Sequence, residues 1–202
     1  MKLRLGSNTR RQRGQSLVEF ALILPLLAAM LAAVLEFGLV MDADMGLEAA
    51  SREGARVSAV LGNDGTQGVC TGTRLTSAEA TVDPAILSTV TASLKSAGID
   101  ITRVQVWIFD ADTNGSPLVV SGVAQVNKYS GTTGSFVSAN GDVWKACGRH
   151  DGTFGGGSYD DVGVQIQYTY KSQTGVLSFL SGGLPMSATA VMPIGPPWTV
   201  QP

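Results

Sequence analysis

The chain has 202 residues, with 14 basic and 16 acidic side chains and a formal net charge of −2. This length accommodates one compact domain with an anchoring segment and is short for two full domains. Five basic residues precede Gly14 without an acidic neighbour, which leaves nine basic against 16 acidic residues in the rest. Basic charge confined to one tip beside an apolar run indicates membrane orientation, and it argues against nucleic acid as a partner.

The first predicted element is an apolar helix from Leu17 to Met41, whose only charged residues are Glu19 and Glu36. On an α-helix these glutamates are about 25 Å apart, close to the roughly 30 Å of a hydrocarbon core, so both carboxylates can reach an interface. The basic cluster predicts a cytoplasmic N-terminus and an exported remainder. A cleaved secretory signal peptide is the competing interpretation. The run is longer than a usual signal core, however, and it has no Ala-x-Ala cleavage pattern.

Three short motifs carry a resemblance to a known family. Residues 13–20, RGQSLVEF, open the apolar run like a type IV prepilin processing site, with a glycine followed five positions later by a glutamate. LEFG at 35–38 and ASREGAR at 50–56 follow in order. Together they resemble the TadE-like family of the tight-adherence (Tad) pilus system, over about the first 60 residues.

The resemblance implies cleavage between Gly14 and Gln15 by a membrane-bound prepilin peptidase on the cytoplasmic side. Residues 1–14 would then be a basic leader, and residues 15–41 the transmembrane helix. The resemblance also implies that Glu19 meets the free amino terminus of a neighbouring subunit. A carboxylate in a low-dielectric helix bundle is tolerable when another chain supplies the opposite charge.

Phe20 stands where the major Tad pilins usually have tyrosine, which points to the minor, pseudopilin-like branch. We therefore expect a single-pass protein of the cytoplasmic (inner) membrane with an extracytoplasmic head, compatible with incorporation in a pilus. The expected partners are the prepilin peptidase, other pilins or pseudopilins, pilus assembly membrane proteins and the lipid bilayer. The alternative is a membrane-anchored, adhesin-like protein that uses its head to bind a surface.

Residues 42–61 continue the helical pattern as a stalk, so that a helix from Ser16 to Leu61 would span about 69 Å. Gly46 and Gly54 allow a close helix contact. That contact is either with another subunit or with this chain's own head, and the sequence favours neither.

The exported head is expected to comprise residues 62–202 and to begin where three glycines in 62–68 break the helix. Asp83 and Pro84 have the pattern of an N-cap followed by a first-turn proline, and apolar residues recur at helical spacing from there to Gly98. This segment is the second predicted helix.

Strands follow. Residues 101–109 and 118–126 alternate in polarity across a turn and are expected to pair as an antiparallel hairpin. The Gly- and Ser-rich stretch 127–159 is expected to be a long irregular excursion. Residues 162–170 and 187–192 are two further strands. The predicted fold class is α+β, a long N-terminal helix and a small head with one further helix and an antiparallel sheet of about four strands.

Catalytic and metal chemistry finds little support. Asp110–Gly115 resembles half of a calcium loop, but Ser121 stands where such a loop needs its closing acid, so a tight turn is the favoured interpretation. His150 is the only histidine and lies in a Gly-rich loop. We therefore expect no enzymatic activity, no cofactor and no metal site.

Cys70 and Cys147 have no nearby Cys or His at metal-ligand spacing. In an exported domain both thiols would meet an oxidising compartment, which favours a disulfide between them. The alternative is two independent thiols. Separation in sequence does not decide between them, because pairing requires close and correctly oriented Cβ atoms.

Overall fold

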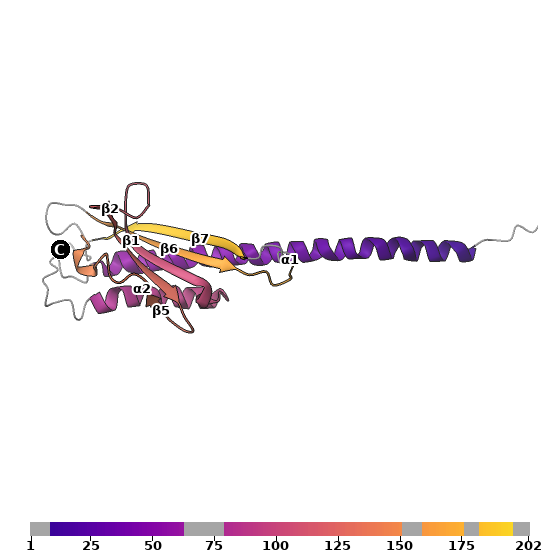
Figure 1. Cartoon of the computed structure of the whole chain (residues 1–202), viewed down its shortest axis with the longest axis horizontal. Coiled ribbons are helices and arrows are strands. Elements are labelled where there is room, and N and C mark those ends of the chain that lie inside the picture. Colours follow the sequence, from indigo (N-terminus) through magenta and orange to yellow (C-terminus); the bar gives the residue numbers. More distant parts are fainter. Residues whose placement is uncertain (1–8, 63–78, 151–158, 176–181, 196–202) are drawn as a thin grey trace, which may run out of the picture.

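The computed structural model describes residues 9–62, 79–150, 159–175 and 182–195. In Figure 1 the N-terminal part of one long helix, α1, extends away from the head, and the other elements gather around its second half. The head contains one further α-helix and a five-stranded antiparallel sheet. The predicted α+β class, with its long apolar helix, is confirmed.

Helix α1 spans Thr9–Leu61, 53 residues or about 80 Å, and ends at Gly62, which has a positive φ of 53°. It begins seven residues before Ser16, where the sequence placed its start. Gly14 therefore lies inside the helix, so the expected boundary between leader and helix is not a structural boundary. Pro25 lies within α1 and does not end it.

Helix α2 spans Glu79–Ser96 and runs antiparallel to α1. The predicted apolar spacing is confirmed, because Ile86, Val90 and Leu94 are fully buried. The helix ends at Gly98, whose φ is 70°, and the Ile99 N–H donates to the Leu94 carbonyl in a Schellman-type cap.

The predicted start of α2 was wrong. The helix begins four residues before Asp83, and Pro84 lies within it rather than in its first turn. The Asp83 carboxylate does not serve as an N-cap at that position. It is buried and accepts hydrogen bonds from residues far away in the sequence. Two adjacent residues with the pattern of an N-cap do not show whether the aspartate caps a helix or accepts hydrogen bonds from distant parts of the chain.

The main sheet has the order β5-β4-β1-β6-β7, with all neighbouring strands antiparallel. Short 3₁₀ turns precede β1 (Ile101–Arg103) and follow β5 (Ala146–Gly148). The strands are β1 Val104–Ala111, β4 Val126–Gly131, β5 Phe136–Ser138, β6 Asp161–Tyr170 and β7 Leu184–Pro193.

The predicted hairpin was wrong in its pairing. Strand β1 pairs with β4, with Val106 opposite Tyr129, and within 118–126 only Val126 belongs to that partner strand, opposite Phe109. The other residues of 118–126 are not part of it. They instead form a separate ribbon from β2 (Val119–Val120) and β3 (Val123–Ala124). Alternating polarity identified strands correctly here, but it does not choose between two adjacent candidate partners.

The expected excursion at 127–159 was also wrong over its first half. It contains most of β4, all of β5 and a 3₁₀ turn. Asn127 is fully buried and Trp144 nearly so. A polar strand of this kind is stabilised by buried side-chain hydrogen bonds, which its amino-acid composition does not reveal.

The core lies between one face of the sheet and the two helices. Val104, Val106 and Ile108 of β1 point into it, as do Val164 and Ile166 of β6. The intervening residues Gln105, Gln165 and Gln167 face the other side. The helices cover one face of the sheet, and the other face is polar apart from a small apolar cluster of Phe109, Ala111 and Val126 with Trp107.

Candidate functional site: the apolar helix and its junction with the head

The predicted processing residues lie together on α1, away from the head. Gly14 is followed by Gln15, whose Nε2 donates to Glu19 Oε1 at 3.2 Å, one helical turn further on. The side chains of Gln15, Glu19 and Phe20 are all exposed. Nothing in the described part of this chain covers Glu19, so its carboxylate is available to a neighbour.

The large apolar side chains that follow, from Leu17 to Leu35, are all exposed. Within the described residues, one helix is long and apolar enough to be a candidate membrane span, with a window of mean hydropathy 2.5 and none of that window buried. The large exposed side chains of this stretch are Leu17, Val18, Phe20, Leu22, Ile23, Leu24, Leu26, Leu27, Met30, Leu31, Val34 and Leu35. Such a surface requires lipid or other apolar helices around it.

The first buried residue along this stretch is Glu36, which is only 2% exposed, although Phe37 and Leu39 beyond it are again exposed. Its Oε1 accepts hydrogen bonds from the Tyr170 hydroxyl at 2.9 Å and the Gln173 N–H at 3.1 Å. Its Oε2 accepts from the Thr174 N–H at 2.9 Å and from the Thr174 hydroxyl. The carboxylate therefore joins α1 to the end of β6 and the loop that follows.

This junction was missed by the sequence reasoning, which placed Glu36 at a membrane interface only. Contacts with the head begin inside the predicted segment 15–41, so the exposed apolar part of α1 that precedes them runs from Leu17 to Leu35, about 28 Å. The available signal was a second acid inside an apolar run. A carboxylate is rarely left there without a partner.

Beyond Glu36, α1 packs closely on its own head. A Cβ added at Gly46 would lie 2.7 Å from the Ala97 Cβ, and one at Gly54 would lie 2.7 Å from Val90 Cγ2. The structure therefore uses both glycines for packing α1 against α2 and the residues that follow it. This decides the alternative that the sequence left open in favour of contact within the chain.

A buried polar cluster ties α2 to the sheet. Asp83 Oδ1 pairs with Arg149 Nη2 at 2.7 Å, and Asp83 Oδ2 accepts from the Tyr129 hydroxyl at 2.7 Å and Asn127 Nδ2 at 2.9 Å. Burial and the neighbouring Asp83 raise the pKa of Tyr129. The Arg149 guanidinium lies 4.3 Å from the Trp144 ring centre. Sequence analysis missed this cluster because its members are far apart in the chain.

The Asp110–Gly115 segment forms a turn. Asp112 Oδ1 accepts from the N–H groups of Asn114 at 2.8 Å and Ser116 at 2.9 Å, and these backbone bonds lower the pKa of Asp112. Nearby, burial first and then Asp160 and Asp161 raise the pKa of Asp110 to about 6. No group of three metal-ligating side chains occurs among the residues described here.

Of the three other residues singled out from the sequence, His150 is described by the structure, Cys147 is described in its backbone, and Cys70 lies outside the described residues. His150 is half-exposed, and its Nδ1 lies 3.2 Å from Asp160 Oδ2. The backbone of Cys147 lies in the 3₁₀ turn Ala146–Gly148, whereas Cys70 and the Cys147 side chain lie outside the described residues. The disulfide stays a prediction.

The match found by comparison with known proteins lies within α1. Residues 14–56 match the family model described as TadE-like protein, which confirms the resemblance expected from the three motifs. The matched range begins at Gly14 and includes Glu19, Phe20 and Glu36. No curated protein and no solved structure matches the chain.

Proposed function

Because residues 14–56 are TadE-like, we propose that this chain is a membrane-anchored component of a Tad-type pilus apparatus that acts as a minor pseudopilin. The proposed role is not enzymatic: the chain takes part in assembly through helix packing and charge pairing with other subunits. The observation that supports it most is the bare, exposed apolar helix that follows Gly14 and carries Glu19 within its second turn.

The proposed orientation rests on charge. Arg10, Arg11 and Arg13 precede Gly14 and hold that end in the cytoplasm, so the head lies on the opposite side of the membrane. The exposed apolar part of α1 between Leu17 and Leu35, about 28 Å long, is close to the thickness of the hydrocarbon core. The chain is then a single-pass protein of the cytoplasmic membrane.

Maturation by a prepilin peptidase is the second part of the proposal. The Gly14–Gln15 bond lies inside α1, where its backbone is folded and shielded, so the peptidase must unwind this part of the helix before cleavage. Glycine in a helix is less stable than alanine by about 1 kcal/mol, which makes Gly14 a favourable place to unwind. Cleavage would leave Gln15 with a free, positively charged amino group.

That new amino group supplies a partner for Glu19 in assembly. Within the described part of one chain, the Glu19 carboxylate accepts a hydrogen bond from the neutral Gln15 amide, at 3.2 Å. In a bundle of apolar helices its carboxylate would be desolvated at a large cost unless a cation joined it. The amino terminus of a second subunit has the required charge and lies at the same depth.

We predict that Glu19→Gln retains membrane insertion but lowers assembly by about tenfold or more, because a neutral amide cannot pair with the amino terminus. The measurement is the amount of this subunit cross-linked to other pilins in cells that make the pilus. The matched control is Glu48→Gln on the same helix, where an exposed ion pair with Arg52 at 3.0 Å is removed. Equal assembly of both variants would contradict the proposed role of Glu19.

A further inference from the structure

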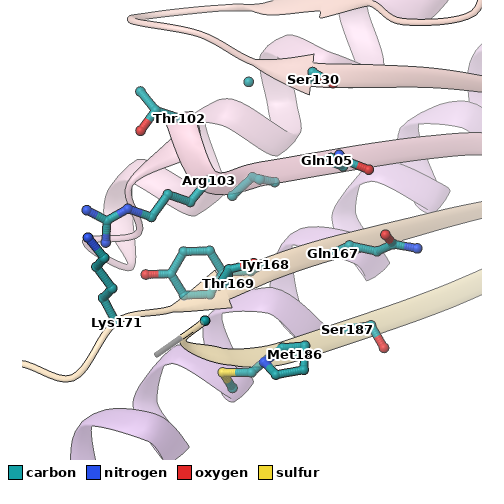
Figure 2. A pocket seen from close by; sticks show the side chains of 14 residues that line it. Thr102, Arg103, Gln105, Ser130, Gln167, Tyr168, Thr169, Lys171, Met186 and Ser187 are labelled. Carbon is teal, nitrogen blue, oxygen red and sulfur yellow. The ribbon is translucent and has the colours of Figure 1, made fainter. Parts of the chain in front are cut away.

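A pocket of about 660 Å³ opens at one end of the sheet, where β1 begins, β6 ends and β7 begins. Figure 2 shows polar side chains around it, from Gln105, Gln167 and Ser187 on the strands to Thr102 and Arg103 before β1. None of the roles described above uses this pocket. Its lining has hydrogen-bond donors from four strands and cations at one end.

Two cations, Arg103 and Lys171, line that end of the pocket. Figure 2 shows the Arg103 and Lys171 side chains extending toward each other past the edge of the sheet. Both residues are exposed, and Arg103 Nε has one acidic neighbour, Asp100 Oδ2, at 3.6 Å. Among the described residues, Lys171 has no carboxylate within ion-pair distance. Two adjacent cations with one partial counter-charge favour an anionic ligand.

The position of this pair follows from the Glu36 junction. Lys171 directly follows Tyr170, whose hydroxyl donates to Glu36, and directly precedes the loop that donates to the same carboxylate. Arg103 is adjacent to Val104, which pairs with Tyr168 two residues before Tyr170. The pair therefore lies at the end of the head from which the exposed apolar part of α1 emerges.

Resting on the membrane insertion proposed above, we propose that Arg103 and Lys171 bind the phosphate of an anionic phospholipid headgroup in the leaflet that faces the head. The Arg103 guanidinium offers two parallel donors to phosphate oxygens, and Lys171 adds a point charge. The polar lining of the pocket, including Ser130 and Gln167, accommodates a hydroxylated headgroup such as glycerol. The head would then rest on the bilayer at a defined orientation.

Other charged residues at this end of the head limit the expected affinity for an anionic headgroup. Asp42 and Asp44 on α1 and Asp100 before β1 oppose the binding of an anion, whereas Lys95 near the end of α2 supports it. The end of the head as a whole is not basic, so the attraction is local to the Arg103–Lys171 pair. At about 1 kcal/mol each, two cations near a membrane surface would enrich anionic lipid about thirtyfold, and the opposing carboxylates reduce the expected enrichment to about tenfold.

The test uses the full chain in nanodiscs of phosphatidylcholine with a trace of phosphatidylglycerol bearing a photoreactive headgroup. Peptides from peptic digestion are then assayed for cross-linked lipid. We expect cross-links at residues 101–105 and 171–175, and a loss of about tenfold in Arg103→Gln/Lys171→Gln. The matched control is Lys128→Gln/Lys145→Gln, which removes the same charge elsewhere on the head and should leave the cross-links unchanged. Unchanged hydrogen exchange in β1 and β6 verifies that both variants are folded.

Three outcomes overturn the inference. Equal cross-linking by a zwitterionic probe with the same photoreactive group would remove the preference for an anion. Equal loss in both double variants would show a general charge effect. Full competition by millimolar free glycerol phosphate would assign the pocket to a soluble phosphate ligand instead of a lipid. Failure of the wild-type chain to enter nanodiscs at all is a different result, because it contradicts the proposed function itself.

Discussion

At the scale of single residues, two carboxylates on α1 have opposite environments. Glu19 is exposed on a bare helix, whereas Glu36 is buried under the head and accepts hydrogen bonds from the end of β6 and the loop after it. A charge inside an apolar helix needs a partner, and each glutamate meets this need differently. Glu36 has its partners within the chain, and we propose that Glu19 pairs with another subunit.

We predict that Glu36→Gln loosens the head from α1. A neutral amide makes weaker hydrogen bonds and presents an NH₂ group where donors already point, so the thermal midpoint of the full chain in detergent should fall. Tyr170→Phe removes a single donor and should lower the midpoint by less. Glu48→Gln, which changes an exposed pair, is the control. A midpoint equal to that of the control would contradict the junction role of Glu36.

Asp110 gives the head a predictable dependence on pH. Its pKa is raised from 3.8 to about 6 by burial and by the neighbouring Asp160 and Asp161, so folding favours the protonated form. The stabilisation is complete below about pH 4 and is lost as pH rises through about 6. Asp110→Asn should therefore raise the free energy of unfolding by about 1 kcal/mol at pH 7.5 and leave it nearly unchanged at pH 4.

The measurement is denaturant unfolding of the full chain at both pH values. Asp112→Asn is the matched control in the same turn, and it should have the opposite sign at pH 7.5. The Asp112 carboxylate is stabilised by the N–H groups of Ser116 and Asn114, so its neutral replacement loses interactions. If Asp110→Asn gained the same stability at pH 4 as at pH 7.5, titration of Asp110 could not be the cause.

At the scale of elements, local patterns identified some segments and not others. Strands β1 and β6 were predicted because one face is apolar and the other carries Gln105, Gln165 and Gln167. Strand β4 was missed because Asn127 and Ser130 suggest a loop. Asn127 is buried because Asp83, Asp142 and Trp144 satisfy its amide, and those residues are distant in sequence.

The candidate site likewise combines a local motif with contacts between residues far apart in the sequence. Gly14, Gln15, Glu19 and Phe20 form one local motif on one helix, so a role in processing can be proposed from the sequence, and that role stays a prediction. The partners of Glu36 lie more than 130 residues further along the chain, at Tyr170, Gln173 and Thr174. No spacing within α1 specifies such a contact, so only the assembled fold reveals it.

The packing of α1 on α2 leads to a pair of opposite predictions. Gly54→Ala places a Cβ 2.7 Å from Val90 Cγ2 and 3.2 Å from Val164 Cγ1, so it should destabilise the full chain by about 1–3 kcal/mol despite the better helix propensity of alanine. Gly38→Ala meets nothing within 4 Å and should be neutral or stabilising by up to about 1 kcal/mol. Chemical denaturation of both variants gives the comparison. Equal changes in the free energy of unfolding for the two variants would contradict close contact at Gly54.

At the scale of the whole molecule, three regions follow one another along a single helix axis. A basic tip precedes Gly14, a bare apolar segment runs to Leu35, and from Glu36 onward the helix is part of the head (Figure 1). The head carries the acidic excess of the chain. This order suits a subunit held in a membrane by its helix until neighbouring helices replace the lipid.

The central claim is that α1 is a prepilin helix cleaved after Gly14. The most direct measurement is the intact mass of the protein purified from cells that contain its pilus system. Cleavage after Gly14 gives a mature chain that begins at Gln15, whereas Gly14→Val should retain the leader and Gly38→Val should be processed normally. A native protein that still begins at Met1 would contradict the account.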